Sequence, residues 1–283
     1  MEPVEIIFLG TGGGRWATIK QARYTGGIRL HSGLKLHIDP GPGAIVRTYQ
    51  LGFDPMKLDG IVISHCHPDH YTDGEVLIEA MTHGMSKRRG FLVGNKTVLD
   101  GVEGFGGPAI SKYHQALPKS KVMLKVGQKA KFEDLEIEAT PAKHSEPETI
   151  GLKFYTNQGI ISSIFDSEYF GGISEPYSGS KVLLLAIMRP FNDRIPFHLC
   201  TEDAIKIVKE AKPELAVLTH FGMKMIIQNP PKQAKLVEKE TGIKTIAAED
   251  GMTINLGKEI TINKITPQRK LESFLEGAPH ERE

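Results

Sequence analysis

Short apolar runs, separated by polar and glycine-containing turns, recur along most of this 283-residue chain. Runs of about four to eight such residues are typical of β-strands buried on one or both faces. The run at 181–187 is almost wholly apolar, which predicts a strand covered on both sides. The pattern predicts strands at Val4–Leu9, Gly27–His31, Leu34–Asp39, Gly60–Ser64, Lys121–Val126, Leu135–Thr140, Ile150–Thr156, Gly159–Phe165, Lys181–Ile187, Leu215–Thr219, Ile243–Ala247, Met252–Leu256 and Glu259–Asn263.

Other segments have a helix-like pattern, and one long segment has no regular pattern. Helices are predicted at Ala44–Leu51, Gly74–His83, Thr201–Ala211 and Pro231–Thr241. The stretch from Gly84 to Pro118 is rich in glycine and basic residues, so we expect a long basic surface loop or flap at about 84–118.

The glycine-rich segment Leu9–Arg15 is only partly similar to a nucleotide-binding fingerprint. Arg15 stands where the third glycine of G-x-G-x-x-G would be, and we expect no strand–helix–strand unit after it. The segment is therefore predicted to be a tight loop near the edge of the sheets at which the candidate ligands described below gather.

The order of the predicted elements indicates the architecture. Strands dominate the first two-thirds of the chain, and helices alternate with strands afterwards. This order is typical of a layered α/β protein with helices outside stacked sheets. No repeat or low-complexity linker divides the chain. We therefore expect a single domain over residues 1–265 and a polar C-terminal extension over 266–283.

A net charge of +1 hides an uneven distribution. Between Lys87 and Lys131 there are ten Lys or Arg residues against two acids, which suits either an anionic substrate or a solvated surface. Two cysteines, Cys66 and Cys200, make no disulfide framework, and the N-terminus lacks the regions of a signal peptide. No apolar run approaches the ~20 residues of a membrane span. We therefore expect a cytoplasmic protein with no membrane partner.

Three histidines and an aspartate fall within Ser64-His65-Cys66-His67-Pro68-Asp69-His70, directly after the apolar run Ile61–Ile63. Side chains alternate along a strand, so His65 and His67 lie on the same side. The turn at the proline lets the aspartate and the last histidine face a point a few ångströms away. This arrangement suits two adjacent metal ions rather than one.

His144, Asp166 and His220 suit metal ligation as well, because each lies just beyond the end of a predicted strand. With these residues the chain resembles the metallo-β-lactamase superfamily of dinuclear metallohydrolases. Residues 65–70 match its signature motif, and the three later residues match its third, fourth and fifth motifs in order. Asp39, in Ile38-Asp39-Pro40-Gly41, matches an early aspartate of the family. The resemblance runs from about residue 4 to 220 and on into the closing strands.

The resemblance implies a four-layer αβ/βα sandwich, with two mixed sheets inside and helices outside. It also implies two metal ions at one edge, joined by Asp166 and a hydroxide. The ligands would be His65, His67 and His144 for one ion, and Asp69, His70 and His220 for the other. Such donors suit Zn²⁺, although Mn²⁺, Fe²⁺ or Ni²⁺ could occupy the same positions. Asp39 is expected to lie outside the ligands and to form a hydrogen bond to one of them.

Several positions indicate the branch of the family. Oxygen-reducing di-iron relatives place a glutamate where this chain has His67, and relatives that cleave β-lactams usually place a cysteine or histidine where it has Asp166. His198 lies ahead of a helix and a strand that lead to His220, a layout that resembles ribonuclease Z and related small phosphodiesterases. Only 22 positions separate His144 from Asp166. This interval leaves no room for the long tRNA-gripping arm typical of ribonuclease Z.

The resemblance favours hydrolysis of a phosphodiester, with the bridging hydroxide as nucleophile. Asp69 would orient the hydroxide or take its proton. His198 would protonate the leaving group, and Arg15 is a candidate phosphate contact. The substrate would be a small anionic molecule or an RNA end, and a homo-oligomer is compatible with this interpretation. Two other functions stay open: a thioester or lactone hydrolase on the same metal pair, and a non-catalytic metal-binding or cofactor-handling accessory protein.

Overall fold

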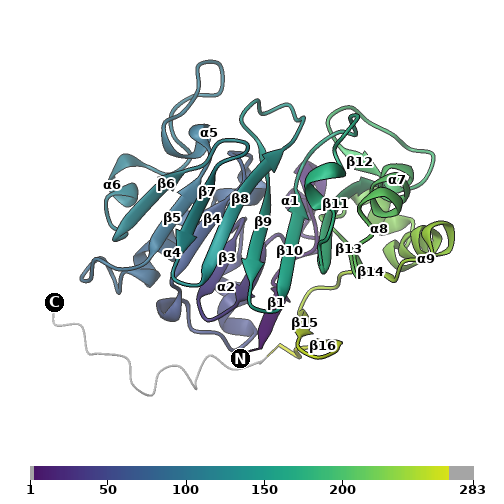
Figure 1. Ribbon diagram of the computed structural model, residues 1–283. Coiled ribbons are helices and arrows are strands. Elements are labelled where there is room, and N and C mark those ends of the chain that lie inside the picture. The colour runs from purple at the N-terminus through teal and green to yellow at the C-terminus, as the bar shows by residue number, and fades with distance from the viewer. Residues whose placement is uncertain (1–2, 268–283) are drawn as a thin grey trace.

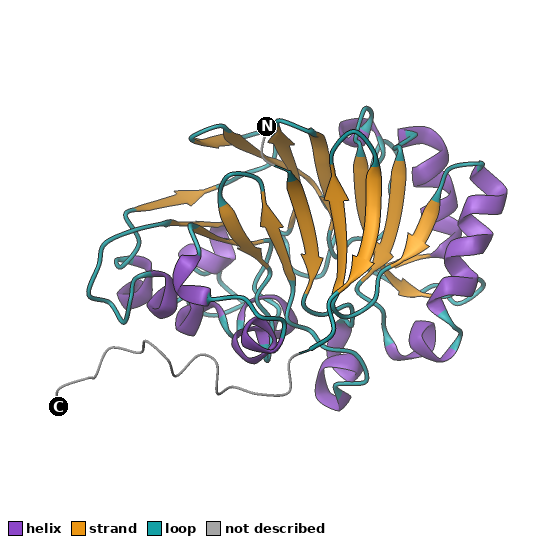
Figure 2. Ribbon diagram, turned by 90° about the horizontal axis from the view of Figure 1, so that it is seen from below, coloured by secondary structure: helices purple, strands orange, loops and turns teal. Residues whose placement is uncertain are grey.

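The computed structural model describes residues 3–267, which form two β-sheets packed face to face with helices on their outer sides (Figure 1, Figure 2). In spatial order the first sheet contains β16 (Ile260–Lys264), β15 (Met252–Leu256), β1 (Val4–Phe8), β2 (Ile28–His31), β3 (Lys35–Ile38), β4 (Gly60–Ile63), β5 (Phe91–Gly94) and β6 (Ser120–Met123). The second sheet contains β14 (Thr245–Ala247), β13 (Leu215–Thr219), β11 (Val182–Arg189), β10 (Gly159–Ile164), β9 (Ile150–Thr156), β8 (Leu135–Pro141) and β7 (Lys129–Phe132). A short strand, β12 (Leu199–Cys200), pairs with β11.

Both sheets are mixed, since each combines parallel and antiparallel neighbours. The α-helices among the described residues are α1 (Gly14–Lys20), α2 (Ala44–Gln50), α3 (Pro68–Tyr71), α4 (Gly74–Met81), α5 (Lys96–Leu99), α6 (Lys112–Gln115), α7 (Thr201–Ala211), α8 (Met223–Ile227) and α9 (Pro230–Thr241). Two 3₁₀ turns, η1 (Pro55–Lys57) and η2 (Glu175–Tyr177), complete the regular structure.

Alternate residues of facing strands form the core between the sheets. Ile6 and Phe8 of β1 lie in one buried cluster with Leu36 of β3 and with Leu152 and Phe154 of β9. Each large apolar side chain that is removed from water stabilises the fold by about 1.5–3 kcal/mol. The same alternation turns the remaining residues of these strands outward.

The outward residues of the central strands pack against helices. Ile61 of β4 lies in a cluster with Leu77 of α4, and Leu183 of β11 lies in a cluster with Ile207 of α7. These strands are therefore buried on both faces, as the apolar run at 181–187 predicts. The predicted four-layer sandwich is confirmed.

The predicted loop at 84–118 is wrong in part, because β5 lies within it. The four residues Phe91–Gly94 are all buried and pair in parallel with β4 on one side and β6 on the other. Two short helices, α5 and α6, also fall in this stretch. A strand of four residues buried on both faces has no polar alternation, so it was hard to distinguish from a glycine-rich loop.

The predicted tight loop at Leu9–Arg15 is correct only up to Gly13. Helix α1 begins at Gly14, so Arg15 lies in the first turn of a helix. The strand that follows, β2, runs antiparallel to β1, and the segment therefore forms no dinucleotide-binding unit.

The predicted polar extension at 266–283 lies outside the described residues except for its first two positions. Among residues 3–267, no helix is both long and apolar enough to cross a bilayer.

Candidate metal centre

Loops at one edge of the two sheets bring the candidate ligands together. His65, His67, Asp69 and His70 follow β4, and α3 begins within the motif at Pro68. His144 follows β8, Asp166 follows β10 and His220 directly follows β13. Three overlapping groups of side chains could each hold a metal ion, because the donor atoms within each group lie within 4.8 Å of one another. The first group is His65, His67, His144 and Asp166, and the second is Asp69, His70 and His220. A third, Asp39, His65 and His70, shares its histidines with the other two.

In the first group, three imidazole nitrogens converge on a single point. The Nε2 atoms of His65 and His144 lie 3.1 and 3.0 Å from Nδ1 of His67. Nδ1 of His144 donates to the carbonyl oxygen of Phe197 at 2.9 Å, so its Nε2 carries a lone pair. Because lone pairs repel at such distances, this arrangement favours a shared cation between them.

His65 is fixed in the same way by Ser64. The Ser64 hydroxyl donates to Asp39 at 2.6 Å, so it must accept from Nδ1 of His65 at 3.0 Å. This assigns the lone pair of His65 to Nε2. Burial lowers the pKa of His65 and His67, and lowers the pKa of His144 to about 4, so all three imidazoles are neutral at pH 7 and able to ligate metal.

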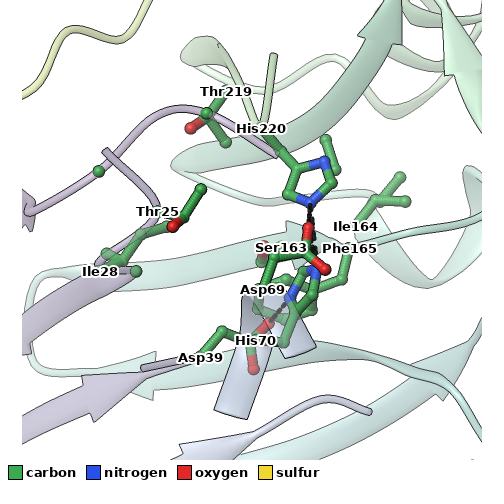
Figure 3. A pocket seen from close by; sticks show the side chains of 14 residues that line it. Thr25, Ile28, Asp39, Asp69, His70, Ser163, Ile164, Phe165, Thr219 and His220 are labelled. Carbon is green, nitrogen blue, oxygen red and sulfur yellow. Dashed lines mark hydrogen bonds and ion pairs between the residues drawn. The ribbon is translucent and has the colours of Figure 1, made fainter. Parts of the chain in front are cut away.

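In the second group, Nε2 of His70 and Nε2 of His220 lie 3.0 Å apart. Oδ2 of Asp69 is 3.3 Å from Nε2 of His220 and 3.6 Å from Nε2 of His70. Figure 3 shows these three side chains close together, with Asp39 below them. Burial lowers the pKa of His70, but the negative charges of Asp69 and Asp39 have the larger combined effect and raise it to about 10. The proton on Nε2 would be exchanged for a metal ion on binding.

Asp166 contacts both groups. Its Oδ2 lies 3.6 Å from Nε2 of His144 and 3.9 Å from Nε2 of His70, and its Oδ1 lies 3.2 Å from Nδ1 of His220. Asp166 is buried, which favours the neutral acid, but the surrounding histidines hold its pKa well below the usual range. Among residues 3–267, its Oδ1 and Nδ1 of His220 are buried and form no well-aligned hydrogen bond, even with each other at 3.2 Å. A bound cation would satisfy such orphaned atoms.

Asp39 supports the centre from behind. Its carboxylate accepts hydrogen bonds from Nδ1 of His70 at 2.8 Å and from both the backbone and the hydroxyl of Ser64. It therefore orients one histidine of each group, directly or through Ser64. Asp39 and His220 both have positive φ, 50° and 57°, which is uncommon for residues other than glycine.

The glycine-rich loop after β1 closes the centre on one side. A Cβ atom at Gly13 would lie 2.2 Å from the ring of His220, so only glycine fits there. The backbone N–H of Gly14 donates to Oδ2 of Asp69 at 2.7 Å. These two glycines were not predicted as part of the site, although their unbroken run was a signal of a close backbone approach.

His198 lies at the mouth of the centre. Its Nε2 is 3.5 Å from Oδ2 of Asp166, and its Nδ1 donates to the carbonyl oxygen of Pro196 at 3.1 Å. Partial burial lowers the pKa of His198, but the interaction with Asp166 outweighs this effect and raises it.

A cavity of about 810 Å³ opens over His67, Asp69, Asp166 and His198. A smaller cavity of about 40 Å³ lies behind Asp69 and His70 (Figure 3). Arg15 lines the large cavity, as do three residues that were not predicted, Trp16, Arg189 and Lys224. Trp16 is the single tryptophan of the chain and is 62% exposed. The signal available in the sequence was the position of this single tryptophan next to the glycine run.

The chain is similar in sequence to several known proteins. A sequence model described as the beta-lactamase superfamily domain matches residues 35–221. "Uncharacterized protein MJ1374" of Methanocaldococcus jannaschii is 45% identical over 258 residues, which cover 89% of this chain and 95% of that protein. A ribonuclease Z of Thermococcus sibiricus is 29% identical over 160 residues, which cover 54% of this chain and 48% of the relative.

Two solved structures have the same fold. The metallo-beta-lactamase fold protein YhfI of Bacillus subtilis has a TM-score of 0.72 at 18% identity, over 90% of this chain and all of that one. A diphosphatase from the PhnP family has a TM-score of 0.65 at 17% identity, over 90% and 97% of the two chains.

Proposed function

This chain belongs to the metallo-β-lactamase superfamily, and we propose that it hydrolyses phosphodiester bonds with two divalent metal ions. The observation that carries the proposal is the position of His198, which lies beside Asp166 at the base of a cleft with basic residues. Cleavage of a P–O bond needs a proton donor for the leaving oxygen and positive charge around the phosphoryl group. Both lie in this cleft.

The donor groups fit metal ions by their chemistry. Neutral imidazole nitrogens converge in one group, and the orphaned atoms of Asp166 and His220 lie in or beside the other. We assign His65, His67 and His144 to one ion, Asp69, His70 and His220 to the second, and Asp166 to both. Mixed imidazole and carboxylate donors favour Zn²⁺. When bound, the ions would lower the pKa of a water molecule towards neutrality and offset charge on the phosphoryl oxygens.

The protein's own residues would handle two protons. Asp69, fixed by the backbone N–H of Gly14, would orient the attacking water and accept its proton. His198 would donate a proton from Nε2 to the leaving oxygen, since the carbonyl of Pro196 orients its ring and Asp166 favours its charged form. No covalent intermediate with a side chain is required.

The cleft suits a phosphate group attached to a flat ring. Arg15, Arg189 and Lys224 line it; Asp193 forms ion pairs with the last two and offsets one of the three charges. The exposed ring of Trp16 offers a surface on which a nucleobase would stack. We therefore propose a nucleotide-like molecule or an RNA end as substrate.

The interval after His144 argues against a pre-tRNA substrate gripped by an arm. It contains β9, the short turn at 157–158 and β10, which pair directly with each other. No inserted arm can be accommodated in this hairpin.

Metal analysis combined with a substrate panel tests the proposal. We expect about two metal ions per chain and cleavage of bis(p-nitrophenyl) phosphate, with no cleavage of a thioester or a lactone. Cleavage of only the thioester or the lactone would contradict phosphodiesterase activity. Two bound ions without turnover on the whole panel would instead favour the accessory protein that the sequence left open.

A further inference from the structure

A second polar cavity lies on the outer face of the first sheet, at the end of β3 away from the metal centre. It measures about 380 Å³ and is lined by residues that include Arg29, Lys35, Phe53 and Lys57. Strand β3 runs from Lys35 at this cavity to Ile38, the residue before Asp39. Since none of the cavity's lining residues also lines the metal cleft, the two sites are separate.

Arg29 is the most unusual group in this cavity. Its side chain lies on β2 between Ile7 of β1 and His37 of β3, and it is only 1% exposed. The ring of Phe53 lies 4.9 Å from the guanidinium carbon. Yet Nε and Nη1 of Arg29 are buried and have no hydrogen-bond partner among the described residues 3–267. A guanidinium has five donors and no acceptor, so burying two of its nitrogens unpaired is costly.

The charge of Arg29 persists at neutral pH. Burial lowers the pKa of Arg29 to about 10, against the opposing effect of Asp54, Asp59 and Glu5. The side chain is therefore a buried cation at pH 7, and no ion pair with a carboxylate is formed by it among residues 3–267.

The other charged groups of the cavity are mostly positive. Lys35 and Lys57 line it, and in the described part of the chain neither forms an ion pair. Asp54 is the acid on the lining, and its Oδ1 already accepts the backbone N–H of Met56 at 2.8 Å. His31 also lines the cavity, and its buried Nε2 has no hydrogen-bond partner in the part of the chain that the structure describes.

We propose that this cavity binds a small phosphate-bearing molecule. The donors of Arg29 match two phosphate oxygens, and the two ammonium groups would neutralise the remaining charge. A cation is disfavoured by the three positive side chains, and a neutral apolar ligand would leave the guanidinium unsatisfied. An adjoining cavity of about 440 Å³ shares Lys35, Asp54 and Lys57, and it gives space for the organic part of the ligand.

Calorimetric titration of inorganic phosphate into the full, metal-loaded chain at constant ionic strength tests this site. The double variant Lys35→Ala/Lys57→Ala should weaken binding at the cavity at least about tenfold, because each lost ammonium removes a charged hydrogen bond. The matched control is Lys209→Ala/Lys239→Ala, which removes two exposed lysines from α7 and α9 and should leave binding unchanged.

A further variant separates this cavity from the metal centre. In the variant His67→Ala/His144→Ala, phosphate should no longer bind at the metal ions. The phosphate binding that depends on Lys35 and Lys57 should remain. Arg29→Met should abolish phosphate binding in the cavity. If this buried substitution prevents folding, the lysine variants alone test whether the cavity binds phosphate. The proposal is overturned if phosphate does not bind, or if all binding survives in the double lysine variant. Either result would mean that the cavity holds only water.

Discussion

The contact between His198 and Asp166 is the residue-level feature on which the proposed chemistry most depends. We predict that His198→Ala retains both metal ions, because His198 is in neither donor group. Its turnover of a phosphodiester should fall about 10²–10⁴-fold, the usual contribution of a general acid. Steady-state kinetics with metal analysis of the same samples measures both quantities.

The matched control for this substitution is His114→Ala. His114 lies on α6, where it pairs with Glu79 and does not line the cleft. Its removal should leave turnover within about twofold of the wild type, since surface changes away from a site have small effects. If both variants have full activity, His198 is not the proton donor.

His37 supplies a prediction about pH and stability. It is fully buried, its Nε2 donates to the carbonyl of Gly26 at 2.7 Å, and burial lowers its pKa to about 3. The unfolded chain binds this proton near pH 6.5, so stability is complete above about 6.5 and falls as the pH drops towards 3. Each pH unit in that window should cost about 1.4 kcal/mol of unfolding free energy.

Urea unfolding at pH 7.5 and pH 5.0 measures this loss. In His37→Gln, which keeps a donor for Gly26, the difference between the two pH values should be smaller by about 2 kcal/mol. Other buried histidines contribute equally to the pH dependence of both proteins, so their effect cancels when the two are compared. Identical pH dependence in the two proteins would show that His37 does not carry the effect.

At the scale of elements, the sequence predicted most of the strands and all of the long helices. The sequence pattern missed elements that are short or whose residues resemble those of an exposed loop. The four residues of β5 are buried on both faces and give no alternation, while the edge strand β7 (Lys129–Phe132) has two lysines in four residues. Helix α1 begins after glycine without any side-chain cap. Local pattern could not reveal these elements, because groups distant in sequence hold them: neighbouring strands pair with β5 and β7, and Asp69 accepts the N–H of Gly14 at the start of α1.

The candidate ligands were easier to locate in the sequence than the backbone atoms that orient their side chains. Histidines and aspartates at strand ends are visible in the sequence, and the structure brings the seven predicted ligands together. By contrast, the carbonyl of Phe197 that fixes His144 and the N–H of Gly14 that fixes Asp69 are backbone atoms. Any residue type offers such atoms, so their role depends on the fold alone.

Helix α1 carries a prediction about substrate binding. Trp16 is 62% exposed on this helix and lines the cleft, so its ring is accessible to a bound molecule. Trp16→Ala should raise KM for a nucleotide-like substrate about tenfold and change kcat little, because stacking of a base is worth about 1–3 kcal/mol. Steady-state kinetics on a dinucleotide would measure this difference.

The control for Trp16 is another exposed aromatic residue. Tyr113 of α6 is 60% exposed and does not line the cleft, so Tyr113→Ala should leave KM unchanged. Quenching of the single tryptophan's fluorescence by the dinucleotide gives an independent measurement of stacking. An unchanged KM in Trp16→Ala would exclude a stacking platform on α1.

At the scale of the whole molecule, the candidate ligands come from loops of both sheets. Asp39, residues 65–70 and their supports come from loops of the first sheet, whereas His144, Asp166 and His220 come from loops of the second. Metal ions held by both groups would therefore cross-link the two halves of the sandwich. In their absence, the cluster of histidines and acids has to be buried with unsatisfied atoms.

Removal of metal should for this reason lower the stability of the entire fold. One ligand at 100 to 1,000 times its dissociation constant stabilises by about 2.7–4.1 kcal/mol, which corresponds to a Tm higher by roughly 5–7 °C in a chain of this size. Calorimetric scans with a chelator, and again after addition of Zn²⁺, should show this drop and its recovery. His67→Ala/His144→Ala should lose much of the response to the chelator. A wild-type Tm that does not change with metal would mean that the donor groups do not bind ions tightly enough to couple the two sheets.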